Sequence, residues 1–338
     1  MTWLSDEPLP ETHRAWVSGK GGKPTDLVLR TLPLPEPEAG CVLVENQLIG
    51  LNPVDWKVLE ERAPGEIPGC DGAGVVTAVG EGVPWHWIGT RVAYHTALAR
   101  AGSFAELTSV PARALLRIPP ALDTATAASM PCPALTAWQA ISKIPAPGGE
   151  SGAAKSLLIS GAGGAVGLYA LQLARARNFA VSVLCHPRHH SRLRSLGAEQ
   201  VFDKAAVDDN KEELQSTFHA IIDATGSDGA AKLAFSLKAN GHLVCVLGRV
   251  AEWPAPAFTC AWSLHEVALG GLHQYGDEAD WAELTHAGER ILEELAARRM
   301  VPETLHVKPF QALPEHLEAL RLRNFSGKAL VAVKEAES

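Results

Sequence analysis

The chain has 338 residues, of which 46% are hydrophobic and 20% charged, and its formal net charge is -8. This length allows two domains with separate cores, and the acidic balance without a Lys/Arg block argues against nucleic acid as a partner. No apolar run reaches membrane-spanning length, and the first residues lack the basic start and apolar core of a signal peptide, so we expect a cytoplasmic protein with no membrane partner.

The first 120 residues carry the pattern of a small β-barrel. Short apolar or alternating runs between Gly, Pro and Asp predict strands from residue 14 to residue 50. The run 52–57, NPVDWK, predicts the start of a short helix, because a proline biases the residue before it away from helical dihedrals. The run 67–76, IPGCDGAGVV, places three glycines before a strand, and the runs 90–95 and 102–107 complete the pattern.

The hydrophobic period changes after this region. The stretch from Leu122 is Ala-rich and helix-prone, with one break at Pro131 and Pro133. We therefore place a domain boundary here, after residue 126.

The strongest local signal is a strand, a glycine turn and a helix between residues 155 and 178. The apolar run 157–159 ends in Ser160 and a glycine cluster, which opens directly into a helical pattern. Glycines let a backbone approach a ligand closely, and a helix N-terminus attracts an anion, so this turn is typical of dinucleotide binding. The spacing departs from G-x-G-x-x-G, but a second β run follows at the distance that a βαβ unit requires.

The pattern after the turn alternates between strands and helices. Strands are expected at 180–185, 200–202, 219–223 and 243–247, with a helix through 192–196. This order predicts a doubly wound parallel sheet. Helices at 278–299 and 314–323 and a last strand at 328–333 follow.

Six runs together resemble the medium-chain dehydrogenase/reductase superfamily, specifically its zinc-free quinone oxidoreductase and enone reductase branch. They are NPVDWK at 52–57, IPGCDGAGVV at 67–76, GSFAE at 102–106, MPCPALTAW at 130–138, SGAGGAVG at 160–167 and FSGKALV at 325–331. The resemblance implies an α/β fold with a GroES-like β-barrel catalytic domain at 1–126, a Rossmann NADP-binding domain at 127–269, and a C-terminal segment at 270–338 that completes the barrel. It also implies an active site in the cleft between the domains, and we expect a homodimer.

The same resemblance bears on whether the protein holds a metal. In zinc-dependent relatives the catalytic ligands are usually Cys, His and Cys, and the matching columns here hold Asn52, Cys70 and Cys132. An amide oxygen is a poor third ligand beside thiolates, and the cysteines are scattered without C-x-x-C pairs. We therefore expect no metal, with Cys70 and Cys132 as small buried residues.

The end of the second Rossmann strand bears on the cofactor. An NAD-preferring unit usually ends this strand in Asp or Glu, whereas here it reads LCHPRHH from residue 184 to residue 190. Arg188 could bind a 2′-phosphate, so NADP(H) is the expected cofactor, although Arg188 could instead coat a helix start. The residues expected to bind the cofactor are Gly161, Gly163, Gly164, Val166, Gly167, Cys185, Arg188, Thr225, Gly226, Gly248 and Lys328.

The candidate catalytic residues are Asn52, Asp55, Lys57, Tyr94 and Thr136. Asn52 could donate to the oxygen of a hydride acceptor, and Lys57 could stabilise an enolate or point to solvent. Asp55 more readily caps the following helix than transfers a proton. Tyr94 or His95 could deliver a proton from the end of a strand facing the cleft.

These expectations predict hydride transfer to a quinone or an activated C=C bond without a metal. Two alternatives stay open, a zinc-dependent alcohol dehydrogenase with an atypical Asn/Cys/Cys site and a non-catalytic NADPH-binding protein.

Overall fold

The computed structural model describes residues 9–148, 154–209 and 211–333. The chain divides into two compact units, of which the first comprises residues 1–132 and 270–338 and the second residues 133–269. The sequence placed the corresponding boundaries after residues 126 and 269. The helix α3 (Pro131–Ser142) spans the first of the observed boundaries.

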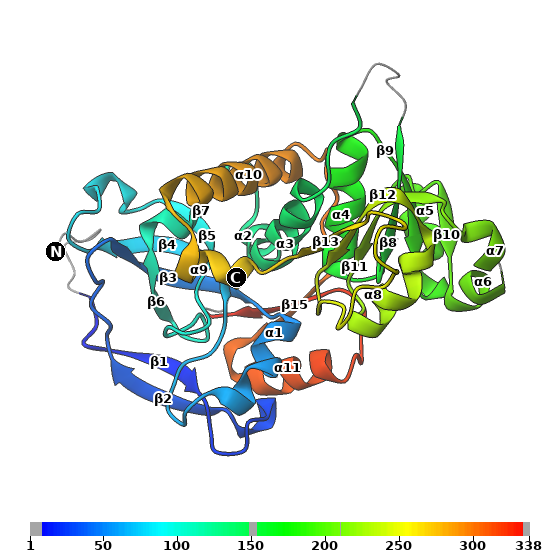
Figure 1. The fold of residues 1–338 in the computed structure, drawn as a ribbon. Coiled ribbons are helices and arrows are strands. Elements are labelled where there is room, and N and C mark those ends of the chain that lie inside the picture. The colour runs from blue at the N-terminus through cyan, green and yellow to red at the C-terminus, as the bar shows by residue number, and fades with distance from the viewer. Residues whose placement is uncertain (1–8, 149–153, 210, 334–338) are drawn as a thin grey trace. The chain divides into compact units, whose positions relative to one another are not determined.

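The first unit is mainly β structure (Figure 1). Its strands are β1 (Thr12–Val17), β2 (Val28–Pro33), β3 (Cys41–Gly50), β4 (Asp71–Val79), β5 (Arg91–His95), β6 (Leu107–Pro111), β7 (Leu115–Arg117), β14 (Leu305–Pro309) and β15 (Lys328–Ala332). Its helices are α1 (Pro53–Lys57), α2 (Thr124–Ala128), α9 (Leu272–Tyr275), α10 (Glu278–Ala296) and α11 (Leu313–Arg321).

Strand β3 is the centre of this unit. It pairs with β4 along most of its length, with β6 at its start and with β15 at its end. Two irregularities in the β3–β4 register mark bulges, which bend a strand and help a sheet to curl. The pairing of β3 with β15 places the C-terminal segment in the N-terminal sheet, so the GroES-like part of the predicted fold is confirmed.

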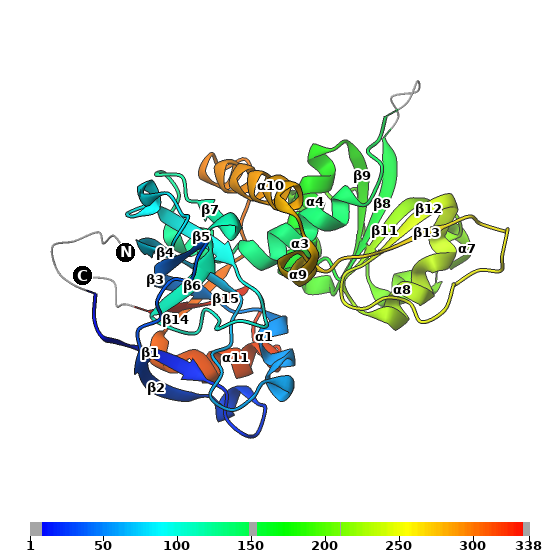
Figure 2. The ribbon, with the colours of Figure 1, turned by 60° about the vertical axis from the view of Figure 1, so that its left-hand side comes forward.

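The β1–β2 hairpin and helix α11 share one apolar core. Leu27, Ile49, Phe310, Leu317 and Val331 are buried there together, although they come from both ends of the chain. Figure 2 shows the hairpin beside α11. Burial of such side chains is the main favourable term in folding, so the two ends of the chain stabilise one another.

The second unit is a six-stranded parallel sheet covered by helices (Figure 2). Its strands are β8 (Lys155–Ser160), β9 (Phe179–Leu184), β10 (Gln200–Phe202), β11 (Phe218–Asp223), β12 (Leu237–Cys245) and β13 (Ser263–Glu266). Its helices are α4 (Ala165–Ala176), α5 (His190–Ser195), α6 (Lys204–Asp209), α7 (Lys211–Leu214) and α8 (Ser227–Leu233). The strand order is β10-β9-β8-β11-β12-β13, which confirms the predicted Rossmann topology.

The strand order fixes where the helices lie. From β8 the chain proceeds outward through α4 to β9, and from β11 it proceeds in the opposite direction through α8 to β12. Because such crossovers are right-handed, α4 and α8 cover opposite faces of the sheet. The order reverses between β8 and β11, and ligands of open α/β sheets bind outside the carboxyl ends of the strands at this point.

Some elements differ from the sequence prediction. Strand β12 begins six residues before the expected run 243–247, and β13, α6, α7 and α8 have no counterpart in the prediction. The break near Pro131 lies before that proline, which occupies the first turn of α3, where its missing N–H costs nothing.

Among the described residues, no helix has both the length and the apolar character needed to cross a bilayer.

Candidate functional site

The glycine turn after β8 has the geometry that the sequence predicts. Gly161 has a φ of +76°, a left-handed conformation that L side chains rarely adopt, and its N–H donates to Leu184 O at 3.0 Å. Gly164 is the N-cap of α4 and is exposed. The unpaired N–H groups of the first turn of α4, which includes Val166, therefore follow directly after an exposed glycine.

The turn glycines have different surroundings. A Cβ at Gly167 would lie 2.4 Å from Ala162 Cα, and one at Gly163 would lie 2.4 Å from His189 Cδ2. A Cβ at Gly164 would meet nothing closer than Gly161 O at 3.7 Å. Gly163 and Gly167 therefore allow close packing inside the protein, whereas the missing side chain of Gly164 leaves space that no protein atom fills.

A cavity of about 1270 Å³ reaches the carboxyl ends of several parallel strands, and Phe235 and Trp262, which precede β12 and β13, line it as well. Ser160 and Gly161 line it after β8, Cys185 after β9 and Thr225 after β11. This volume exceeds the roughly 300–1,000 Å³ of ordinary ligand pockets, so it is sufficient for a ligand of dinucleotide size. Three of the predicted cofactor residues, Gly161, Cys185 and Thr225, thus meet at one cavity.

The two remaining predicted glycines of this unit follow the neighbouring strands. Gly226 comes after β11 and Gly248 after β12, and neither lines the cavity. The loop at Gly226 is fixed by Asp223, whose carboxylate accepts from Gly226 N at 2.9 Å and from Thr225 Oγ1 at 2.7 Å. Thr136, predicted as catalytic, is half-buried on α3 and does not line the cavity either.

The charged groups near the end of β9 are basic. Arg188 is exposed beside the cavity-lining Pro187, and its Nε donates to His189 Nε2 at 3.0 Å. Lys204, Lys211 and Lys232 line the cavity itself, together with Asp203 and Asp208. Sequence reasoning missed the three lysines because they follow β10 or lie on α7 and α8, at positions with no local glycine or strand signal.

In the first unit, Asn52 belongs to a buried network. Its amide nitrogen donates to Asp71 Oδ2 at 2.8 Å and lies 3.3 Å from Gly50 O and 3.5 Å from Cys70 Sγ. Its amide oxygen accepts from Lys328 Nζ, which also lies 3.6 Å from Asp71 Oδ2. Both amide hydrogens therefore have acceptors within the unit, and the expected donation by Asn52 to a substrate oxygen is not supported.

The ammonium group of Lys328, a predicted cofactor-binding residue, lies in the same buried network. Only 4% of Lys328 is exposed, and the group contacts Asn52 and Asp71. The pKa of the Asp71 carboxyl is raised because burial outweighs the charge of Lys328. The contact links residues 276 positions apart, so no local sequence pattern could have indicated it.

Asp55 and Lys57 lie on α1 but face different environments. Asp55 is buried, and its Oδ2 accepts from Asn52 N at 2.7 Å, which is the capping role favoured from the sequence. Burial raises the pKa of Asp55 to about 7. Lys57 is exposed, and its Nζ lies 5.7 Å from the centre of the Trp56 ring.

Tyr94 lies in the interior of the first unit. It is fully buried in the first unit, its hydroxyl donates to Asn46 Oδ1 at 2.8 Å, and burial raises its pKa. The hydroxyl of Tyr94, predicted to deliver a proton, is thus held by Asn46 inside the first unit. Successive side chains of a strand point to opposite faces, so Tyr94 and His95 cannot both face one site.

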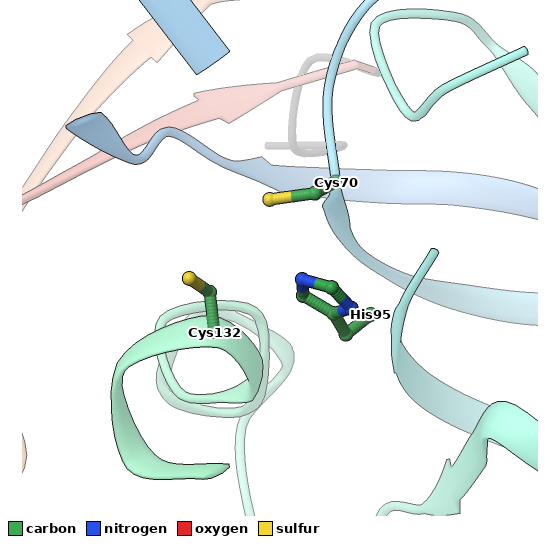
Figure 3. A group of neighbouring side chains, drawn as sticks. All are labelled: Cys70, His95 and Cys132. Carbon is green, nitrogen blue, oxygen red and sulfur yellow. The ribbon is translucent and has the colours of Figure 1, made fainter. Parts of the chain in front are cut away.

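His95 instead joins the two cysteines. The ligand atoms of Cys70, His95 and Cys132 all lie within 4.8 Å of one another, and a ring nitrogen of His95 faces the two thiols (Figure 3). Cys70 precedes β4, His95 ends β5, and the pairing of Asp71 with His95 brings them together. Cys132 lies in the first turn of α3, where its N–H donates to both carboxylate oxygens of Asp71.

This cluster corrects one premise of the sequence analysis. From the sequence, Asn52 was considered beside Cys70 and Cys132, and Asn52 is a poor metal ligand. His95, at the end of β5, supplies a better third metal ligand. The pKa of Cys132 is lowered because its thiolate accepts from Cys70 and His95, and that of Cys70 is raised by the same hydrogen bond and by burial. Two cysteines and a histidine are a donor set that zinc accepts.

Comparisons with known proteins agree with this arrangement. Residues 38–120 match the family described as "Alcohol dehydrogenase GroES-like domain" and residues 165–289 the family described as "Zinc-binding dehydrogenase". Together the two matches cover more than half of the chain.

Two similar curated proteins are named as a quinone-oxidoreductase homolog and a trans-enoyl reductase. The chain is 34% identical over 202 residues to a chloroplastic quinone-oxidoreductase homolog of Spinacia oleracea, covering 56% of this chain and 60% of that protein. It is 35% identical over 207 residues to the trans-enoyl reductase RAP2 of Pyricularia oryzae, covering 58% of each. The chain thus spans less than two thirds of the length of these relatives.

A solved structure covers nearly the whole chain. The alcohol dehydrogenase superfamily protein from Novosphingobium aromaticivorans is 26% identical, with a TM-score of 0.83 over 96% of this chain and 100% of that one.

Proposed function

We propose that this chain, which belongs to the medium-chain dehydrogenase/reductase superfamily, is an NADPH-dependent oxidoreductase that reduces a quinone or an activated C=C bond. The observation that carries the proposal is the glycine turn at the edge of a cavity large enough for a dinucleotide, at the reversal point of a Rossmann sheet. Hydride is the chemistry that the nicotinamide cofactor supplies when bound.

The chain's own residues bind and orient the cofactor in this proposal. The N–H groups at the start of α4 take the diphosphate, and the open side of Gly164 lets the phosphates approach the backbone. The part of the cavity wall that faces the ribose and base is formed by Gly161, Cys185 and Thr225. The hydrogen bonds between Thr225 and Asp223 keep that wall in one conformation.

The choice of NADPH rests on charge at the end of β9. No carboxylate stands between Cys185 and His190 to accept hydrogen bonds from a ribose hydroxyl pair, and Arg188 is exposed beside the cavity. Lys204, Lys211 and Lys232 add positive charge to the cavity wall. A 2′-phosphate carries negative charge, so we expect this region to favour NADPH over NADH.

The substrate class is carried over from the relatives. A quinone-oxidoreductase homolog and a trans-enoyl reductase are both named for reactions of conjugated acceptors. Hydride transfer to such an acceptor needs a donor, an acceptor and positioning, so we propose that it proceeds without a metal. Chelation should then leave the rate of quinone and enone reduction unchanged.

A second candidate function is a metal-dependent alcohol or aldehyde oxidoreductase, and the cluster of Cys70, His95 and Cys132 favours it. A zinc ion there would polarise a carbonyl oxygen. Oxidation of simple alcohols that is lost on chelation and restored by zinc would support this candidate against the first. Cofactor binding without turnover of any of these substrates would support a binding protein instead.

The cofactor preference is tested by changing Arg188. Arg188→Ala should weaken NADPH binding by roughly 1.5–3 kcal/mol, the contribution of a hydrogen bond to a charged group, and leave NADH binding nearly unchanged. Fluorescence titration with both cofactors measures this difference. Arg290→Ala, at an exposed arginine of the first unit, is the matched control. Equal losses for both cofactors in Arg188→Ala would contradict the proposal.

A further inference from the structure

We propose that the cavity of the second unit takes a second ligand besides the cofactor, a fatty acid or a similar amphipathic anion, in the part that lies before β12 and β13. We call this part the inner pocket, and its wall comprises Leu233, Ala234, Phe235 and Trp262. The inference is independent of the proposed reduction, because binding of this ligand is measured without turnover.

The cavity extends along the sheet from one edge to the other. Gly161, Cys185 and Thr225 line it where β8, β9 and β11 end. Phe235 and Trp262 line it just before β12 and β13 begin. All strands of a parallel sheet run in one direction, so their ends and their starts lie at opposite edges. The inner pocket therefore lies at the edge opposite to the cofactor turn.

Helix α8 connects the two edges. Gly229, near its start, and Leu233, at its end, both line the cavity. At a rise of about 1.5 Å per residue, the seven residues of this helix span about 10 Å. The volume of about 1270 Å³ also exceeds that of ordinary pockets for one ligand. The cofactor and a second ligand can thus be bound at the same time.

The wall of the inner pocket is apolar. Leu233, Ala234 and Trp262 are buried, and Phe235 is half-buried. The indole N–H of Trp262 is the one hydrogen-bond donor among these four side chains, and it donates to Lys238 O at 2.9 Å. These side chains therefore offer no partner to a phosphate or a sugar hydroxyl. They favour a hydrocarbon chain, which leaves water when it enters the pocket.

Two lysines place positive charge beside this wall. Lys232 lies on the last turn of α8, and Lys211 Nζ lies 5.3 Å from the centre of the Phe235 ring. Both lysines are exposed and line the cavity. Asp203 and Asp208 line it too, but its three lysines outnumber them. An apolar wall bordered by ammonium groups fits a hydrocarbon chain with one carboxylate, since a charge-assisted hydrogen bond can hold the carboxylate.

Calorimetric titration of the full-length chain with dodecanoate tests the proposal. One dodecanoate should bind per chain with a negative heat-capacity change, because apolar surface is buried. Decanoate, which is two CH2 groups shorter, should bind about 10-fold more weakly. A saturating concentration of NADPH should leave the dodecanoate affinity nearly unchanged, since the two ligands occupy opposite edges of the sheet.

Variants separate the inner pocket from the cofactor turn. Ala234→Phe should abolish dodecanoate binding, because the ring fills the pocket, and should leave NADPH binding unchanged. Gly164→Val should show the opposite pattern, with NADPH binding lost and dodecanoate binding retained. Circular dichroism confirms that each variant is folded.

A charge reversal tests the lysines without changing the apolar wall. Lys211→Glu should weaken dodecanoate binding by about 10-fold or more, as expected when a hydrogen bond to a charged group is lost. Lys143→Glu, at an exposed lysine of the second unit that does not line the cavity, is the matched control.

Three results would overturn the inference. They are no dodecanoate binding by the folded wild-type chain, displacement of dodecanoate by NADPH in a one-to-one ratio, and unchanged dodecanoate affinity in folded Ala234→Phe or Lys211→Glu. The second result would assign the whole cavity to the cofactor. Dodecanoate binding by a chain that does not bind NADPH would support the inference and contradict the proposed function.

Discussion

The two candidate sites of this molecule differ in which parts of the chain form them. In the second unit, loops that follow parallel strands supply part of the cavity wall, with Gly161 after β8, Cys185 after β9 and Thr225 after β11. In the first unit, buried side chains from distant segments form the cluster around Asp71. A change in the first kind of site should act mainly on the ligand, whereas a change in the second should act on folding as well.

The largest effect should come from breaking the buried ion pair. Lys328→Met leaves the fully buried Asp71 without its cation, which typically costs about 3–5 kcal/mol. Urea unfolding should show this loss in the free energy of unfolding of the first unit. Lys308→Met, at an exposed lysine on the neighbouring strand β14, should change it little. Similar stability of the two variants would mean that the pair does not stabilise the fold.

The next largest effects are on cofactor binding and stability, and they should differ between Gly164 and Gly167, two glycines of the turn after β8. Gly164→Val should abolish NADPH binding and leave thermal stability unchanged, because its side chain enters space that no protein atom fills. Gly167→Val should also destabilise the second unit by about 1–3 kcal/mol, since its Cβ would overlap Ala162. Calorimetric titration and thermal unfolding of both variants measure the contrast. Normal NADPH binding by Gly164→Val would show that the diphosphate does not lie at this turn.

The smallest expected effect is on the pH dependence of the stability of the second unit. Burial, with Lys155 nearby, lowers the pKa of His219 from 6.5 to about 4. Between these values the unfolded chain binds a proton that the folded chain does not, so stability is lost as pH falls through this window. His219→Asn should therefore lose less stability than the wild type between about pH 7 and about pH 5 in thermal unfolding. His286→Asn, at an exposed histidine of α10, is the control, and an identical pH dependence in His219→Asn would contradict the shift.

The difference between the sites also explains what the sequence could predict. The turn at Gly161 and the Rossmann order follow from local patterns, because glycine spacing and the alternation of strands and helices lie within short windows. Strand β13 was not predicted because its four residues show no apolar alternation and are largely half-buried.

The cluster could be predicted only in part. The resemblance brought Cys70 and Cys132 to one site, but His95 joins them through the pairing of β4 with β5, which no local pattern shows. The alternation of side chains along β5 indicates only that one of Tyr94 and His95 faces the site. Gly72 has no side chain, and the ring of Tyr94 fills the space beside it in the interior of the first unit, so His95 faces the site. The bond from Lys328 to Asn52 links positions 276 residues apart and required the structure.

The pairing of β15 with β3 has a consequence for the order of folding during translation. A ribosome makes β3 and β4 early, yet β15 and Lys328 emerge only after the whole second unit has been synthesised. Residues 133–269 are contiguous and can fold as they emerge, because their contacts lie within the unit. Until β15 pairs with residues 48–50, that end of β3 is an open sheet edge, and Asp71 lacks the cation that Lys328 later supplies.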